Sequence, residues 1–329
     1  MKIKSRKALV LGATGQGGSL MSKYLLDKGH YVYGLVRKSA TGNLENIKKI
    51  LKNKRFKVIH GDLLDTISLQ DTIKKIKPDE IYNFADQDHV RWSFQIPTYS
   101  FQVTGAAVIN ILEIIKNITP KTKYFQPLSS NMYAGSKKSK QNENEIFSPR
   151  SIYGLGKVSA YYACKMYKEV FDLNICGAIF YNHESEIRPE EYVTRKITKA
   201  VARIYYKKQK KISLGNIDSK IDWGYAEDYV EAAYRIMQLN NPDYFIIGSG
   251  ESHSVEYFLK KSFEYVGLNY KKYLVVNKKL LRPSKNVTLV ADTTKARKTF
   301  NYKSKTNLDK LISIMMENDL KIEKNSQND

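Results

Sequence analysis

Short apolar runs alternate with amphipathic segments over the first 180 or so residues, and this alternation constrains the fold more than any other feature of the chain. The runs read KALVLGA, YVYGLVR, FKVIHGD, EIYNFA, YFQPLSS and NICGAIFY, and a segment with helical spacing follows each one. Strands that are continuously apolar suit a parallel sheet covered by helices on both faces. The sequence therefore predicts an α/β fold, a doubly wound parallel sheet of the Rossmann type.

The C-terminal part of the chain has a different pattern. After about residue 183 the segments EEYVTRKITKAVARIYY, SVEYFLKKSFEYVG and LDKLISIMMENDLKI have the spacing of amphipathic helices, and DYFIIGS alone has that of a core strand. We therefore expect a Rossmann domain over residues 1–182, to which a strand near 243–249 returns. A smaller substrate-binding lobe should occupy mainly residues 183–320, and residues 321–329 should form a frayed tail.

Charge and composition restrict the function classes. The net charge is +22, but the lysines are scattered among acidic residues and Asn, so no nucleic-acid-binding arm is predicted. Because no run of 18 apolar residues occurs and the N-terminus leads directly into a strand, we expect a cytoplasmic protein without a membrane segment. Cys164 and Cys176 lie in apolar surroundings, which predicts packing roles and no metal site.

Glycines follow the first predicted strand in VLGATGQGGS. Gly12, Gly15 and Gly18 have GxxGxxG spacing and precede a helix, an arrangement that lets a helix N-terminus hold the pyrophosphate of a dinucleotide. Asp62 and Leu63 end the third strand, where such folds cover the adenine. The second strand ends in Val36, Arg37 and Lys38 without the acidic residue that binds a ribose hydroxyl, which by itself favours NADP.

A tyrosine and a lysine suggest the chemistry. Tyr153 and Lys157 are four residues apart in SPRSIYGLGK, so on a helix they share one face. A tyrosine can exchange a proton with an alcohol when a neighbouring ammonium lowers the pKa of the phenol, and Lys157 supplies that charge. Ser129, at the end of the fifth strand, completes a site for oxidising a hydroxyl to a ketone.

The chain resembles the extended short-chain dehydrogenase/reductases, specifically the GDP-mannose 4,6-dehydratase branch, from residue 7 to about residue 320. The blocks that carry the resemblance are NFADQDHV, SPRSIYGLGK, FYNHES, YVTRKITKAVARI, LGNIDSKIDWGYAEDYVEA and GESHSVEYF. It implies a tightly bound nicotinamide cofactor held by Gly12, Thr14, Gly15, Gln16, Gly17, Gly18, Arg37, Asp62, Leu63, Phe84, Ala85, Gln87, Tyr153 and Lys157. It implies a GDP-sugar held by Asp88, His89, Ser130, Asn182, Glu184, Thr194, Arg195, Lys196, Leu214, Gly215, Asn216, Lys220 and Arg282.

The chain departs from the family pattern around the cofactor. Its second-strand loop reads VRKSATGNLENI, with Lys38, Glu45 and Asn46 where the family carries further arginines. Because this loop has fewer guanidinium groups and one additional carboxylate, we expect NAD(H) as the cofactor, with NADP(H) as the alternative.

Further departures lie on the substrate side. The family block AAQSHV is replaced by ADQDHV, which adds Asp86 and Asp88, so the sugar can differ from mannose. An Arg of the family becomes Ile221, and its RPxE segment becomes Arg282, Pro283, Ser284 and Lys285. These changes affect the far end of the nucleotide pocket.

The TSE loop of the family becomes Ser129, Ser130 and Asn131, which removes a glutamate. A 4,6-dehydratase needs that glutamate to move protons during elimination, and an amide does not titrate in the usable range. We therefore predict NAD-dependent oxidation of C4 of GDP-mannose or GDP-D-glycero-manno-heptose without dehydration, in the synthesis of capsule or surface polysaccharide precursors. The alternatives are a 4,6-dehydratase with Asp86 or Asp88 as the acid, a 4-epimerase, and a non-catalytic sugar-nucleotide-binding protein. We also expect an external hydride acceptor, such as a 2-keto acid, and a homodimer or homotetramer.

Overall fold

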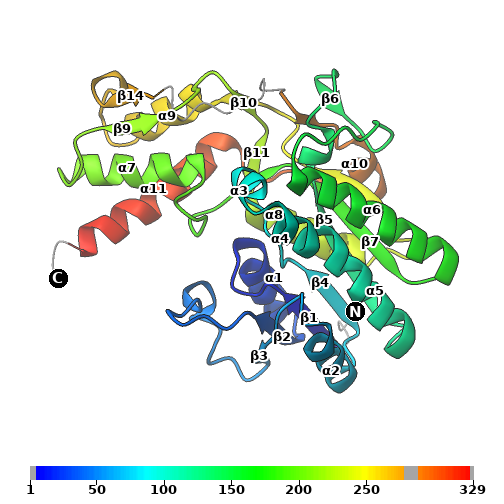
Figure 1. The fold of residues 1–329 in the computed structure, drawn as a ribbon. Coiled ribbons are helices and arrows are strands. Elements are labelled where there is room, and N and C mark those ends of the chain that lie inside the picture. The colour runs from blue at the N-terminus through cyan, green and yellow to red at the C-terminus, as the bar shows by residue number, and fades with distance from the viewer. Residues whose placement is uncertain (1–4, 278–287, 327–329) are drawn as a thin grey trace.

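The computed structural model describes residues 5–277 and 288–326, and a seven-stranded parallel sheet lies at its centre (Figure 1). The strand order is β12-β7-β5-β4-β1-β2-β3. The strands are β1 (Lys7–Leu11), β2 (Tyr31–Val36), β3 (Phe56–His60), β4 (Glu80–Asn83), β5 (Lys123–Ser129), β7 (Ile175–Phe180) and β12 (Tyr244–Ile247). Each coincides with a predicted apolar run, and the predicted doubly wound parallel sheet is confirmed.

Helices cover both faces of the sheet because alternate strand residues point to opposite sides. Leu9 and Leu11 face one layer and Ala8 and Val10 the other, and all four are fully buried. The first layer consists of α2 (Thr66–Ile76), α5 (Ala107–Ile118) and α6 (Ile152–Phe171). The second consists of α1 (Gln16–Asp27), α8 (Ala226–Met237) and α10 (Thr294–Phe300).

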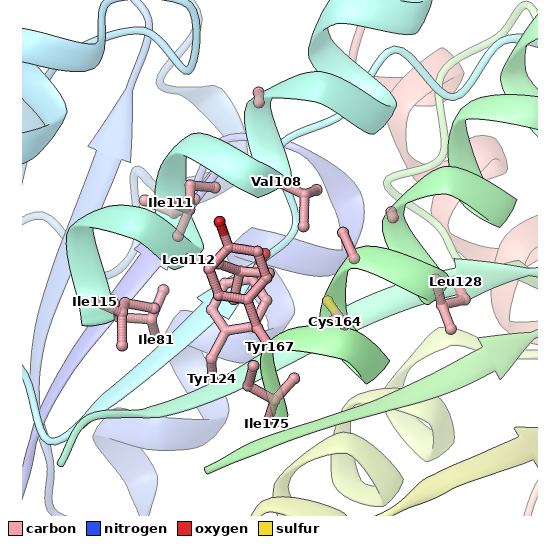
Figure 2. Close-up of a cluster of buried hydrophobic side chains, with 14 of the residues drawn as sticks. Ile81, Val108, Ile111, Leu112, Ile115, Tyr124, Leu128, Cys164, Tyr167 and Ile175 are labelled. Carbon is pink, nitrogen blue, oxygen red and sulfur yellow. The ribbon is translucent and has the colours of Figure 1, made fainter. Parts of the chain in front are cut away.

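Figure 2 shows the core under the first layer. Ile111 and Leu112 of α5 approach Tyr124 of β5 and Ile175 of β7, and Cys164 of α6 packs beside them. Cys176 lies in the core on the opposite face. Both cysteines are buried and free, so their predicted packing role is confirmed.

A second lobe lies beside the sheet, at the upper left of Figure 1. Its own core includes Trp223, Phe258, Phe263, Leu311 and Met315. Its helices are α7 (Val193–Tyr205), α9 (Val255–Glu264) and α11 (Leu308–Asn325). The strands β9 (Ile212–Leu214) and β14 (Leu274–Val276) pair beside them.

The chain passes between the two lobes more than once. The helices α8 and α10 pack on the sheet although both follow residue 183. Two helices therefore return to the first domain together with the predicted strand. Short strand pairs connect the passages, namely β8 (Asn182–Glu184) with β11 (Trp223–Tyr225), β10 (Lys220–Ile221) with β13 (His253–Ser254), and β6 (Lys140–Gln141) with β15 (Val290–Ala291). The remaining short turns are the 3-10 helices η1 (Glu45–Ile47), η3 (Ser130–Tyr133) and η4 (Tyr270–Lys272).

The predicted frayed tail over residues 321–329 is wrong in its first part. Helix α11 continues to Asn325 because its last turns bind α7 and the residues after it. The Glu323 carboxylate accepts a hydrogen bond from Arg203 at 3.2 Å and pairs with Lys208 at 3.3 Å.

One helical stretch connects the sheet to the site and is broken by a π-helical turn. It runs through α4 (Pro97–Phe101), the π turn η2 (Gln102–Ala106) and α5, and α3 (Val90–Gln95) precedes it. Among the described residues, this Pro97–Ile118 stretch is the one helix whose length and composition would allow it to cross a membrane. A core helix passes the same test, and much of this stretch is buried against the sheet.

The π turn passes close to the first turns of α6.

Candidate active site

The candidate site lies where the carboxyl ends of the central strands meet. The chain order reverses between β1 and β4, and open parallel sheets bind ligands in the crevice at such a reversal. The loops after β1, β4 and β5 carry the predicted residues to this edge.

The glycine turn after β1 fits the pyrophosphate of a dinucleotide. Gly12 has a φ of +73°, and a Cβ there would lie 2.6 Å from the backbone N of Ala85. A Cβ on Gly18 would lie 2.1 Å from the Gly12 carbonyl oxygen, and one on Gly17 would meet the Phe84 ring at 2.5 Å. Helix α1 starts directly after Gly15 without a side-chain cap, so its first backbone N–H groups remain available to an anion.

Two polar side chains of the predicted cofactor set are used within the protein. The Gln16 amide donates to the His183 carbonyl at 3.0 Å and accepts from the Ser185 hydroxyl at 2.7 Å, which joins the glycine turn to the loop after β8. The Gln87 amide donates to Ser100 at 2.7 Å and accepts from the His89 backbone N–H at 2.8 Å. Both side chains thus have internal partners, and the prediction that these residues contact the cofactor stays a prediction.

The residues predicted to contact the adenosine of the cofactor are held by short local contacts. The Asp62 carboxylate accepts from the Leu64 N–H at 2.9 Å, and Leu63 is buried under it. Arg37 is exposed and donates to the Tyr99 hydroxyl at 2.8 Å. Asn46 donates to the Thr14 carbonyl at 2.9 Å, which fixes the loop over the glycine turn.

The three predicted catalytic residues come together as expected. Ser129 ends β5, while Tyr153 and Lys157 lie in the first two turns of α6, whose N-cap is Ser151. The Lys157 Nζ lies 5.7 Å from the centre of the Tyr153 ring and donates to the Pro127 carbonyl at 2.8 Å. Tyr153 and Lys157 are buried, at 7% and 4% exposure.

The predicted effect of Lys157 on Tyr153 is not seen in the structure. Burial raises the pKa of Tyr153 well above its ordinary value, the charges of Asp86 and Asp88 raise it further, and a hydrogen bond with Ser129 opposes the rise. The sequence predicted a lowered pKa. Burial is the largest cause of the difference, and Asp86, whose charge adds to the rise, also forms an ion pair with Lys157, at 2.5 Å between Oδ2 and Nζ.

Asn131 changes the hydrogen bonding of Ser129. Its backbone N–H and its side-chain amide both donate to the Ser129 Oγ, at 3.2 and 3.3 Å. A glutamate at this position would accept a hydrogen bond instead. Because Ser129 Oγ accepts from Asn131, its own hydroxyl hydrogen can be donated to Tyr153, with which Ser129 forms a hydrogen bond.

Two residues that the sequence reasoning missed, Arg188 and Tyr192, lie on the substrate side. The Tyr192 hydroxyl donates to the Asp88 carboxylate at 2.8 Å, and the Arg188 guanidinium stacks on the Tyr192 ring at 3.5 Å. Arg188 also pairs with Asp88 at 3.6 Å and with Glu184 at 3.4 Å. The signal that could have identified them is their position, since Arg188 lies between the FYNHES and YVTRKITKAVARI blocks and Tyr192 is the first residue of the second block.

Several predicted substrate contacts have structural partners. Thr194 donates to the buried Glu184 at 2.7 Å, and burial raises the pKa of Glu184. Arg195 is 7% exposed, and its Nε and Nη2 bind Asp319 of α11 at 2.8–2.9 Å. Arg195 Nη1 binds the carbonyls of Glu186 and Arg188. These contacts hold α7 against α11 and the loop after β8, so Arg195 has a structural role, and its predicted contact with the nucleotide stays a prediction.

A cavity of about 560 Å³ opens beside the loop after β4 and before α7, and its size suits a small-molecule ligand. The residues that line it are His89, Arg91, Trp92, Gln95, Glu190, Glu191 and Lys196. Of the predicted substrate residues, His89 and Lys196 belong to it.

The other predicted substrate residues lie elsewhere. Asn182 is exposed at the start of β8, Ser130 is buried in η3, and Leu214 has its side chain in the core of the second lobe. Gly215 and Asn216 follow β9, and Lys220 lies in β10. Arg282, with Pro283, Ser284 and Lys285, is outside the described residues. Within the described parts of the chain, no group of three or more His, Cys, Asp or Glu side chains could hold a metal ion.

This fold, with a glycine turn at the edge of the sheet and a Ser, Tyr and Lys set beside it, defines an extended short-chain dehydrogenase/reductase. The model of the GDP-mannose 4,6 dehydratase family matches residues 9–315. GDP-mannose 4,6 dehydratase 1 of Arabidopsis thaliana is 40% identical over 333 residues, which cover 98% of this chain and 92% of that protein. Human GDP-mannose 4,6 dehydratase is 35% identical over 346 residues, with 98% and 93% covered. The chain therefore belongs to the GDP-mannose 4,6-dehydratase family.

A solved structure confirms the fold class. The dTDP-glucose 4,6-dehydratase of Bacillus anthracis in complex with NAD superimposes with a TM-score of 0.83 and 98% of each chain covered. The sequence identity is 19%, so this likeness concerns the fold alone.

Proposed function

We propose that the protein oxidises C4 of a GDP-linked, manno-configured sugar with a nicotinamide cofactor. The observation that carries the proposal is the convergence of Ser129, Tyr153 and Lys157 beside the glycine turn. The name shared by the Arabidopsis and human relatives supports a GDP-sugar as the substrate.

Each residue of the trio has a separate role. Tyr153 accepts the proton of the C4 hydroxyl, and Ser129, which hydrogen-bonds Tyr153 in the structure, turns its hydroxyl hydrogen to the C4 oxygen when the sugar is bound. Lys157 has three N–H donors, of which Pro127 and Asp86 use two, so one remains for a ribose hydroxyl. When bound, the cofactor accepts the hydride from C4.

NAD is the cofactor that the adenosine side favours. Arg37 already donates to Tyr99, and Glu45 adds a carboxylate to the same loop, so this loop offers little charge to a 2′-phosphate. Denaturing the purified protein and weighing the released dinucleotide tests this choice. Release of NADP alone would contradict it.

Full 4,6-dehydration is the first candidate for the overall reaction, because the relatives carry that name. Elimination of water needs an acid or base near C5 and C6, and Asn131 cannot act as one. Asp86 is committed to Lys157. Asp88 is the remaining new carboxylate, half-exposed on the substrate side and held by Tyr192, and we assign the proton transfer to it.

Asn131 favours a second candidate, a 4-dehydrogenase that releases the 4-keto sugar with its C6 oxygen in place. Loss of a general acid or base typically slows a step by about 10²–10⁴-fold. If Asp88 does not replace the family glutamate, oxidation continues while elimination stalls, and an external acceptor such as a 2-keto acid must regenerate the cofactor. GDP-mannose and GDP-D-glycero-manno-heptose are the substrates to compare, and the additional carboxylates suit a sugar with an additional hydroxyl.

Mass spectrometry of the products from these two GDP-sugars separates the candidates. Dehydration removes about 18 mass units and oxidation about 2, whereas epimerisation leaves the mass unchanged. For a dehydratase, Asp88→Asn should convert loss of water into simple oxidation, while Asn131→Ala should still dehydrate. Absence of any C4-modified product with either sugar would overturn the proposed function.

A further inference from the structure

Asp86, beside the catalytic trio, is held by three donors. Its Oδ2 contacts Lys157 Nζ at 2.5 Å, and its Oδ1 accepts from the Thr104 hydroxyl at 2.6 Å and from the Gln87 N–H at 2.8 Å. The side chains of Asp86 and Lys157 are 11% and 5% exposed. The pair is therefore a buried ion pair in which both carboxylate oxygens have donors.

The fold provides a dedicated partner for this carboxylate. Thr104 lies in the π turn η2, and π turns often occur at functional sites. Gly105 and Gly156 let the π turn approach α6 so closely that a Cβ on Gly105 would lie 3.3 Å from the Gly156 backbone. Through this contact, the π turn and Asp86 together fix the direction of the Lys157 ammonium.

We propose that Asp86 is a positioning residue that orients Lys157 and, by offsetting its charge, sets the pH range in which Tyr153 can exchange its proton. The inference rests on the proposed function of Tyr153 and Lys157 in oxidation at C4. The family block AAQSHV has alanine where this chain has Asp86, so the carboxylate that offsets the Lys157 charge is a feature of this chain.

The charges around the pair support this inference. The loop after β4 contributes Asp86 and Asp88, α6 contributes Lys157, the loop after β8 contributes Arg188, and Tyr192 precedes α7. His183 of β8 faces Lys157, but burial and Arg188 lower the pKa of His183 to about 4, so its ring is neutral near pH 7. Glu184 of β8 also pairs with Arg188, so three carboxylates surround the two cations, and Asp86 is the one that pairs with Lys157. Without Asp86, the Lys157 ammonium would stand uncompensated 5.7 Å from the Tyr153 ring centre and favour the phenolate.

Asp86→Asn is the discriminating variant because it removes the charge and leaves the side-chain oxygen for Thr104 and Gln87. In a plot of kcat/KM against pH, we expect the rising limb to shift to lower pH by about one pH unit. The KM for the GDP-sugar should stay unchanged within about twofold. Asp86→Glu restores the charge, so its rising limb should lie close to that of the unmodified protein. The proposal would be overturned if the rising limb of Asp86→Asn did not shift, or if Asp86→Glu shifted it equally. A change in Asp86→Asn that affected only KM or only the melting temperature would also overturn it.

A second readout does not depend on turnover. Ultraviolet absorbance reports the ionisation of Tyr153 as the difference between each protein and its Tyr153→Phe counterpart. The proposal expects a lower titration midpoint in Asp86→Asn than in the unmodified protein, and an equal midpoint overturns it. If no GDP-sugar supports turnover but this midpoint still moves, the proposed function fails and the role of Asp86 stands.

Discussion

Arg195 and Lys196 are adjacent in the sequence, yet they have different surroundings. Arg195 points into the protein and binds Asp319, whereas Lys196 lines the cavity. Leaving one partner of a buried ion pair uncompensated typically costs about 3–5 kcal/mol. Arg195→Ala should therefore lower the free energy of unfolding by about that amount, as measured by urea denaturation.

Lys196→Ala is the matched variant, and it should change binding instead. Loss of a charged contact to a diphosphate weakens affinity by roughly tenfold, which calorimetry with GDP can measure. We expect its free energy of unfolding to change by less than about 0.5 kcal/mol. An unchanged affinity for GDP in Lys196→Ala would show that the cavity is not the nucleotide site.

Sequence reasoning identified Ser129, Tyr153 and Lys157 because local spacing and the end of a strand place them. It could not place Asp86 opposite Lys157, since that contact depends on how the loop after β4 meets α6 through the π turn. The same limit applies to Arg195, which was assigned from a motif although its partner Asp319 comes from the last helix.

At the scale of elements, the turn between β1 and α1 gives the sharpest prediction. A Cβ on Gly18 would lie 2.1 Å from the Gly12 carbonyl oxygen, and this contact involves backbone that cannot move aside cheaply. Gly18→Ala should destabilise the protein by about 1–3 kcal/mol and abolish retention of the dinucleotide. Thermal unfolding and quantitation of copurified cofactor measure the two effects.

Gly42→Ala serves as a control for that variant. Gly42 has a positive φ of +81°, which Gly18 does not have, but a Cβ on Gly42 would meet nothing within 4 Å. We expect a small loss of stability and full retention of the cofactor. Equal loss of cofactor in both variants would show that the glycine turn has no specific role.

The seven strands could be predicted because each is a short apolar run, and such runs are visible without tertiary information. The central strands are buried on both faces, whereas the edge strand β3 has Lys57 and His60 exposed. The short pairs such as β8 with β11 could not, since two or three residues carry no periodic signal. The end of α11 was missed because Glu323 and its partners Arg203 and Lys208 are far apart in the sequence.

At the scale of the whole molecule, His183 connects stability to pH. Burial and the charge of Arg188 lower its pKa from 6.5 to about 4, so the unfolded chain binds a proton that the folded chain does not. The stabilisation from neutral His183 is complete above about pH 6.5 and is lost progressively as the pH falls toward about 4. Urea denaturation over this range should show the decline, and His183→Gln should flatten it. An equal slope in the two proteins would contradict this account.

The account depends most on oxidation at C4, and a GDP-sugar deuterated at C4 tests that step directly. With GDP-mannose or GDP-D-glycero-manno-heptose labelled in this way, deuterium should leave C4 and appear either in the bound cofactor or at C6 of a dehydrated product. Tyr153→Phe should bind the sugar nucleotide but release no label. Turnover in which all deuterium stays at C4 of a product that is not the C4 epimer would contradict the central claim.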